Sequence, residues 1–192
     1  MVPKKETRRE HILTTTRRLI LENGLQATSM NRISKESGVP MGSIYSLFPS
    51  KEILVNTLYR ECRDCLFQGF LTASPSELSP QDSFKAVLRQ YINTAMAHKE
   101  MFLFVAQYHL SPVISEDDRI EHDLQFGSKK ISELIELGAF RKMDYLIIDA
   151  LILGAINKIL SLHFTGHILL TERMIEDTLD ACWRAVSNDA YC

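Results

Sequence analysis

A run of small and hydroxyl-bearing side chains between Gly38 and Pro49 carries the clearest chemical signal in this chain. Apolar residues spaced three and four apart predict a helix over 41–48 with one side turned toward a core, namely Ile44, Leu47 and Phe48. The opposite side would present Met41, Gly42, Ser43, Tyr45 and Ser46. Because hydroxyl groups both donate and accept hydrogen bonds, this side suits close contact with a polar partner.

The residues around this helix predict how the chain positions it. Ile33–Ser37 reads as the end of a preceding helix, and Gly38 supplies the positive φ that a sharp reversal needs. Pro40 suits the first turn of the next helix, Pro49 stops that helix, and Ser50 caps the one that follows. Two short helices joined by a tight turn with a glycine are typical of a helix-turn-helix, whose second helix enters the major groove of DNA.

The same stretch resembles the N-terminal signature of the tetracycline-repressor (TetR) family over residues 6–60. The matching residues are Gly24, Thr28-Ser29-Met30, Ile33, Gly38-Val39, Gly42-Ser43-Ile44-Tyr45, Phe48 and Ser50-Lys51-Glu52. The resemblance implies an all-helical, cytoplasmic regulator that binds a palindromic operator as a homodimer and releases it when a small molecule enters the C-terminal domain. Leu47 departs from the family, which often has a phosphate-touching His or Tyr there, and Met41 replaces a residue that is commonly polar or basic.

Contacts with DNA are expected from this stretch and from the helix starts on either side of it. Thr28 or Ser29 would cap the second helix, beside N–H groups that also suit a phosphate, although a cap with no role in DNA binding is equally supported. Tyr45 and Lys51 are expected at phosphates, and Met41 and Ser43 at base edges. The expected DNA-binding residues are Thr28, Ser29, Met41, Gly42, Ser43, Tyr45, Ser46 and Lys51.

Charge is distributed unevenly along the chain. Residues 1–51 hold nine basic and four acidic side chains and so carry +5, which leaves −7 for the rest of a chain whose net charge is −2. A basic N-terminal region on an acidic body is typical of a nucleic-acid footprint confined to one end. On charge alone, the alternative that Arg and Lys merely solvate the first helix stays open.

The whole chain predicts an all-α protein in two parts. A three-helix DNA-binding head is expected at 1–52, and a helical effector-binding and dimerisation domain at 53–192. The length of 192 residues and the 45% hydrophobic content are ample for a real core. Besides the helix-turn-helix, helices are expected over 6–22, 51–71, 80–98, 117–137 and 145–164, with a last one from Thr171 onward.

Aromatic and histidine side chains of the second part could line an effector pocket, because such pockets are mostly apolar with a few polar groups. Ordinary core packing is the alternative for each of them. No cofactor or metal is expected: Cys62 and Cys65 lack further ligands nearby, and Gly166 would break the helix between His163 and His167. The expected ligand-binding residues are Phe102, Tyr108, His109, Phe126, His163 and Phe164.

Two apolar segments near the C-terminus, 145–164 and 172–187, predict the dimer interface. The first is long enough to span a membrane, but Asp149, Asn157 and Lys158 interrupt it. We therefore expect a helix buried all round by its own core and a partner subunit, and no contact with a membrane. The expected interface residues are Leu151, Gly154, Ala155 and Trp183.

These patterns predict a DNA-binding transcriptional regulator rather than an enzyme, because no nucleotide-binding loop, nucleophile elbow or metal signature is present. A ligand-responsive repressor is the main expectation, with a small apolar effector and a double-stranded operator as partners. A DNA-binding activator or a ligand-independent regulator is the alternative. Met1–Glu10 is charged with no apolar segment after it, so no secretory signal is expected, and the resemblance to the TetR family implies a cytoplasmic location.

Overall fold

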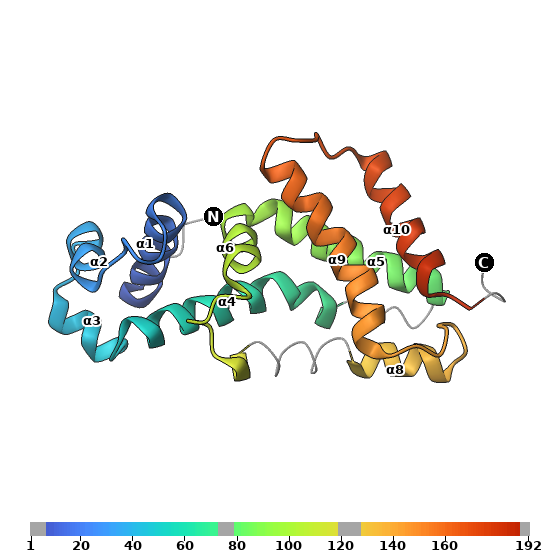
Figure 1. The fold of residues 1–192 in the computed structure, drawn as a ribbon, viewed down its shortest axis with the longest axis horizontal. Coiled ribbons are helices and arrows are strands. Elements are labelled where there is room, and N and C mark those ends of the chain that lie inside the picture. Colours follow the sequence, from blue (N-terminus) through green and yellow to red (C-terminus); the bar gives the residue numbers. More distant parts are fainter. Residues whose placement is uncertain (1–6, 73–78, 119–127, 189–192) are drawn as a thin grey trace. The chain divides into compact units, whose positions relative to one another are not determined.

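The computed structural model describes residues 7–72, 79–118 and 128–188 (Figure 1). Regular structure in these residues is α-helical, with one isolated β-bridge between Phe140 and Ser187. The all-α prediction is therefore confirmed. The helices are α1 (Arg8–Asn23), α2 (Met30–Ser37), α3 (Met41–Leu47), α4 (Lys51–Thr72), α5 (Pro80–Ala97), α6 (Lys99–Tyr108), α8 (Ser128–Glu136), α9 (Tyr145–Phe164) and α10 (Glu172–Val186).

The chain forms two compact units whose limits differ from the expected head and body. The first unit runs to Arg63 and also takes in Glu100–Ser115, and the second takes in Asp64–Lys99 and the residues from Glu116 on. The first unit therefore contains α6, which lies far along the sequence from the helix-turn-helix. The expected division at residue 52 left out this segment because nothing local in the sequence ties it to the head.

Helix α1 begins and ends through signals that its own sequence supplies. Thr7 is its N-cap: the Thr7 hydroxyl accepts a hydrogen bond from the Glu10 backbone, and the Glu10 carboxylate accepts one from the Thr7 backbone. This reciprocal capping box satisfies two backbone donors that the first turn would leave unpaired. At the other end, Gly24 adopts a φ of 82°, and the chain turns away toward α2.

One apolar core holds the first unit together. Ile12 and Ile20 of α1, Ile33 of α2, Ile44 of α3 and Phe104 of α6 are all fully buried in it. Helices as short as α2 and α3, with 8 and 7 residues, are not stable alone in water. Burying a large aliphatic side chain contributes about 1.5–3 kcal/mol, so this core is what keeps the helix-turn-helix folded.

In the second unit, α10 packs against α5 and α9, and α8 packs against α9. Three aromatic rings, from Phe84, Phe140 and Trp183, lie with their centroids 5.4–5.8 Å apart. Trp183 is only 1% exposed. The prediction that Trp183 lies in the dimer interface is therefore wrong, because its ring fills the interior of its own chain.

Helix α9 is buried on one side only. Its other side exposes large apolar residues, including Leu146 at 64%, Ile147 at 53% and Leu151 at 42%. The chain's own core covers only part of this helix, since 22% of its most apolar stretch is buried within the chain, and burial of the rest by a partner subunit stays a prediction. Its length and mean hydropathy of 1.8 would also suit a membrane span, but that is weak evidence from a single helix. The buried stripe consists of Ile148, Ile152, Ile156 and Leu160.

Candidate nucleic-acid interface

The turn between α2 and α3 has the helix-turn-helix geometry that the sequence predicts. Gly38 ends α2 in the left-handed conformation, with φ 65° and ψ 10°, which glycine adopts without a steric penalty. The Ser34 hydroxyl donates to the Val39 carbonyl at 2.7 Å and closes the turn. α3 begins directly afterward at Met41, following Pro40.

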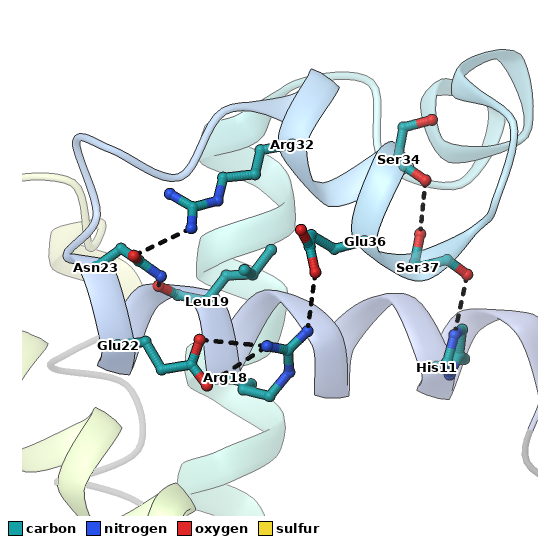
Figure 2. Close-up of polar contacts among 9 residues, drawn as sticks. All are labelled: His11, Arg18, Leu19, Glu22, Asn23, Arg32, Ser34, Glu36 and Ser37. Atoms are coloured by element: carbon teal, nitrogen blue, oxygen red, sulfur yellow. Dashed lines mark hydrogen bonds and ion pairs between the residues drawn. The ribbon is translucent and has the colours of Figure 1, made fainter.

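Polar contacts hold α2 onto α1 and so fix the direction in which the turn points (Figure 2). The His11 ring places Nε2 at 3.1 Å from the Ser37 carbonyl oxygen, which accepts a hydrogen bond when Nε2 is protonated. The Arg18 guanidinium lies 3.5 Å from the Glu36 carboxylate. Figure 2 also shows the hydrogen bond from Arg32 to Asn23, at 3.0 Å.

The outward side of α3 carries most of the residues that the sequence placed at DNA. Gly42, Tyr45 and Ser46 are exposed, Tyr45 at 46%, whereas Met41 and Ser43 are half-buried. Met41 packs partly against the core of the first unit, which leaves less of it available to a partner.

Leu47 is more exposed than its spacing predicted. Its side chain is 42% exposed, whereas Ile44 and Phe48 are buried as expected. Leu47 is the last residue of α3, and the chain becomes extended at Phe48, whose side chain rather than that of Leu47 is buried in the core. The prediction that Leu47 faces the core is therefore wrong.

At the start of α2, the two candidate capping residues have different roles. Ser29 is the N-cap, and its hydroxyl accepts from the Arg32 backbone at 3.2 Å. Thr28 is fully buried, and its hydroxyl donates to the Gly24 carbonyl at 2.9 Å. The prediction that Thr28 contacts DNA is therefore wrong, because its hydroxyl group points into the protein. Ser29 keeps its place at the candidate surface.

Lys51 is engaged within the protein. Its ammonium group donates to the Leu25 carbonyl at 2.6 Å, across the loop between α1 and α2. Partial burial lowers the pKa of Lys51 below its ordinary value. An ammonium group has three donors, so one bond to Leu25 leaves others for a phosphate. Lys51 thus joins the start of α4 to the loop that precedes α2.

Arginines of α1 are held by carboxylates of the first unit. Arg9 pairs with Glu61, and Arg17 lies 3.4 Å from Glu100. Exposed pairs of this kind contribute little stability, but they keep these side chains on the protein surface. Lys35 of α2 is exposed and forms no ion pair with the residues that the structure describes. Of these basic side chains, Lys35 is therefore available to a polyanion such as DNA, whereas Arg9 and Arg17 are engaged with carboxylates.

Asn56 of α4 is a functional candidate that sequence reasoning missed. It is only 7% exposed; its amide donates to the Val113 carbonyl at 2.8 Å and accepts from the Ser115 backbone at 2.8 Å. One turn on, the Tyr59 hydroxyl lies 2.6 Å from Nδ1 of His109. These bonds tie α4 to the segment that follows α6. The sequence gives only a weak signal for this role: Asn56 is a poor helix former that stands among apolar residues of a helix.

The structure does not gather the expected effector-binding residues within one unit. Phe102 and Tyr108 are buried in the first unit, where His109 bonds to Tyr59. His163 and Phe164 belong to the second unit and are half-buried. Phe126 falls outside the described residues.

A small apolar cavity lies elsewhere, inside the second unit. Its volume of about 10 Å³ has room for roughly one water molecule. No residue of the expected effector set lines it, and the sequence carries no local signal for it, because its walls come from separate helices. They are Ile92, Ile156, Ile159, Leu160, Leu170, Ile175 and Thr178.

Metal-binding side chains do not cluster in the part of the chain that the structure describes, where no three His, Cys, Asp or Glu residues converge. Cys62 is buried and Cys65 half-buried. Cys182 is also buried, and burial raises the pKa of its thiol above the ordinary value, which disfavours the reactive thiolate.

Comparison with known protein families gives a match over the helix-turn-helix. Residues 12–58 match the family model described as bacterial regulatory proteins, tetR family. The chain is 27% identical over 143 residues to the HTH-type transcriptional repressor KstR2 of Mycobacterium tuberculosis, covering 70% of each chain. It is 34% identical over 83 residues to the HTH-type transcriptional regulator LmrA of Bacillus subtilis, covering 43% of this chain and 44% of that protein.

Solved structures resemble the fold over almost the whole chain. A TetR family transcription regulator from Marinobacter aquaeolei VT8 has a TM-score of 0.84 at 16% identity, covering 94% of this chain and 95% of that one. A second regulator, from Shewanella sp. PV-4, has a TM-score of 0.85 at 18% identity, covering 95% of this chain and 100% of the other. At such low identity the likeness concerns the fold.

Proposed function

Because the chain belongs to the TetR family of transcription regulators, we propose that it is a ligand-responsive repressor that binds a palindromic operator as a homodimer. The observation that carries the proposal is the helix-turn-helix itself, with Gly42, Tyr45 and Ser46 of α3 turned outward and α2 held onto α1. A relative that covers 70% of the chain bears the name of a repressor. We propose that it acts in the cytoplasm, where its DNA target lies.

The DNA contact of one head would be weak. α3 has 7 residues, and none of its side chains is charged. Two heads joined through their bodies would read two half-sites, and the second contact would then be intramolecular. Such linkage raises the overall affinity by about a hundredfold or more without any new contact.

The exposed side of α9 supports a homodimer. Leu146, Ile147 and Leu151 are large apolar residues in water, with Ala150 and Gly154 exposed beside them. Burying each large side chain against a second copy would contribute about 1.5–3 kcal/mol at most. The small residues would let the partner backbone approach. Leu151, Gly154 and Ala155 therefore remain our candidates for the interface.

Release by an effector needs a physical route to the DNA-binding helices. Asn56 and Tyr59 bind α4 to the segment directly after α6, and α4 begins four residues after α3 ends. An effector that displaces α6 together with this segment would therefore act on the helix adjoining α3. It must bind the arrangement that cannot hold DNA better than the one that can. A tenfold loss of operator affinity needs about 1.4 kcal/mol of this difference.

The effector is proposed to be small and mostly apolar. Phe102, Tyr108, His109, His163 and Phe164 stay as candidate contacts, although in the isolated units they serve as packing or hydrogen-bonding residues. Burial of aromatic surface is the main source of affinity available in such a set.

The test is transcription in vitro from a promoter that carries a bound operator. A repressor lowers the transcript level in proportion to operator occupancy, and an apolar effector restores it. An increase in transcript on binding would identify an activator, and the repressor proposal would be wrong. If no apolar compound changes the occupancy of the operator, the protein is a ligand-independent regulator. Linkage supplies a check, because operator DNA must weaken effector binding by the same factor by which the effector weakens operator binding.

A further inference from the structure

The side chains of α3 exclude the strongest base contacts in the major groove. Residues 41–47 include no Arg, Lys, Asn, Gln, Asp or Glu. Bidentate recognition of guanine requires Arg or Lys, that of adenine requires Asn or Gln, and cytosine is read by a carboxylate. What α3 offers is hydroxyl groups and apolar surface. The 5-methyl group of thymine is the apolar feature that base pairs present in this groove.

Gly42 has no structural reason to be glycine. Its φ is not positive, so another residue would adopt the same backbone conformation. A Cβ added at Gly42 would meet no other heavy atom within 4 Å, so packing does not exclude a side chain either. Glycine in a helix is less favourable than alanine because it loses more backbone freedom on folding. Close approach of an external partner is the remaining physical role for it.

The neighbours of Gly42 on the helix surface define what would approach. Positions 42, 45 and 46 share one face, because residues three and four apart are neighbours on a helix. Tyr45 is 46% exposed, so its ring offers apolar surface beside the bare backbone of Gly42. The Ser46 hydroxyl donates to the Ser43 carbonyl at 2.9 Å, which uses up its one donor. Beside Gly42, this face therefore provides apolar contact from the Tyr45 ring and an acceptor from Ser46, and its remaining donor is the Tyr45 hydroxyl at the end of the ring.

We infer that the face formed by Gly42, Tyr45 and Ser46 recognises a thymine in each operator half-site. The methyl group of this thymine would pack against Gly42, beside the Tyr45 ring. The inference rests on the proposed function and specifies the chemistry of the same surface. It makes Gly42 a specificity-determining residue, because any side chain at that position would occupy the place of the methyl group. Phosphate contacts, which carry no sequence information directly, would come as expected from Lys51 and from the hydroxyl group at the far end of the Tyr45 ring.

The experiment begins with selection of bound duplexes from a random-sequence library by the full-length protein. In the selected operator, each thymine is then replaced singly by deoxyuridine, which removes only the methyl group. Binding is measured by fluorescence anisotropy at one salt concentration. Loss of one buried methyl contact is expected to weaken binding about fourfold per half-site, and about fifteenfold when both half-sites are changed.

A variant protein locates the contact. Gly42→Ala should weaken binding to the thymine operator and abolish the difference between thymine and deoxyuridine at the sensitive position. Its binding to an unrelated duplex should be unchanged, and its thermal unfolding midpoint should not fall, which separates a lost contact from a damaged head. The deoxyuridine series uses the unaltered protein, so the inference is tested even if the variant does not fold.

Two results would overturn the inference while leaving the proposed function intact. One is an enriched motif in which no deoxyuridine replacement within a half-site weakens binding. The other is a deoxyuridine effect that persists at full size in Gly42→Ala. If selection enriches no motif at all, sequence-specific binding fails, and the inference fails with it.

Discussion

The dimer interface can be tested with a single substitution at Gly154. This residue lies on the exposed side of α9, and a Cβ added there would meet no heavy atom of its own chain within 4 Å. Gly154→Arg should therefore fold as a single chain, because the new side chain extends into open space. In a dimer formed through this face, it would bring a guanidinium into an apolar contact.

The magnitude follows from the cost of an unpaired buried charge, which is about 3–5 kcal/mol. Two-fold symmetry introduces the charge twice, but arginine can bend its head group toward water, so we take the lower end. A total of about 6 kcal/mol corresponds to roughly four powers of ten in the dissociation constant. A dimer with a Kd of about 1 nM would then dissociate near 10 µM.

Sedimentation velocity across this concentration range measures the effect, with circular dichroism to establish that the variant is folded. Gly154→Ala is the matched control: it adds one methyl group and no charge, and it should remain a dimer. A folded Gly154→Arg protein that is dimeric at every concentration would refute the assignment of this face. A monomer that bound the palindrome as tightly as the unaltered protein would refute the role of the dimer in DNA binding.

Further predictions concern the first unit. Asn56→Ala should lower the free energy of unfolding, measured by denaturant titration, by about 1–3 kcal/mol, because the Val113 carbonyl and the Ser115 amide lose their hydrogen bonds to Asn56. Thr57→Ala is the control: it loses one exposed hydrogen bond from Arg60 and should lower the same free energy by less than about 1 kcal/mol. If the two variants are equally stable, the hydrogen bonds of Asn56 to Val113 and Ser115 do not stabilise the fold. Lys51→Met should weaken binding to all duplexes alike and reduce the slope of log K against log salt by about 0.9, as expected for one lost phosphate contact. An unchanged slope would mean that Lys51 serves only to hold the loop through its bond to a backbone carbonyl.

The helix-turn-helix could be predicted because its signals are local. Gly38 has the left-handed φ that a reversal at that point requires, and α3 begins at Met41 as expected. Helix ends depend on capping side chains and on proline and glycine, which are visible in a single sequence. For the same reason α9 begins at Tyr145 and ends at Phe164, as the apolar segment predicted.

The misplaced residues depend on tertiary packing. A hydrophobic stripe indicates that Trp183 is buried but not which chain buries it, and here its own Phe84 and Phe140 do so. Thr28 and Ser29 are both good capping residues, and a shift of one position decides which hydroxyl is exposed. The expected effector set failed to converge within one unit because a pocket is a property of the packed helices and leaves no local pattern.

The most direct test of the central claim is the affinity of the full-length protein for its selected palindrome and for a scrambled duplex of the same length and composition. Both titrations use one salt concentration, because electrostatic attraction to phosphates affects them equally. If α3 reads a base sequence in the major groove, the palindrome should bind about a thousandfold or more tighter than the scrambled duplex. Equal affinities that fall together with rising salt would contradict sequence-specific regulation and leave only a basic surface that attracts DNA.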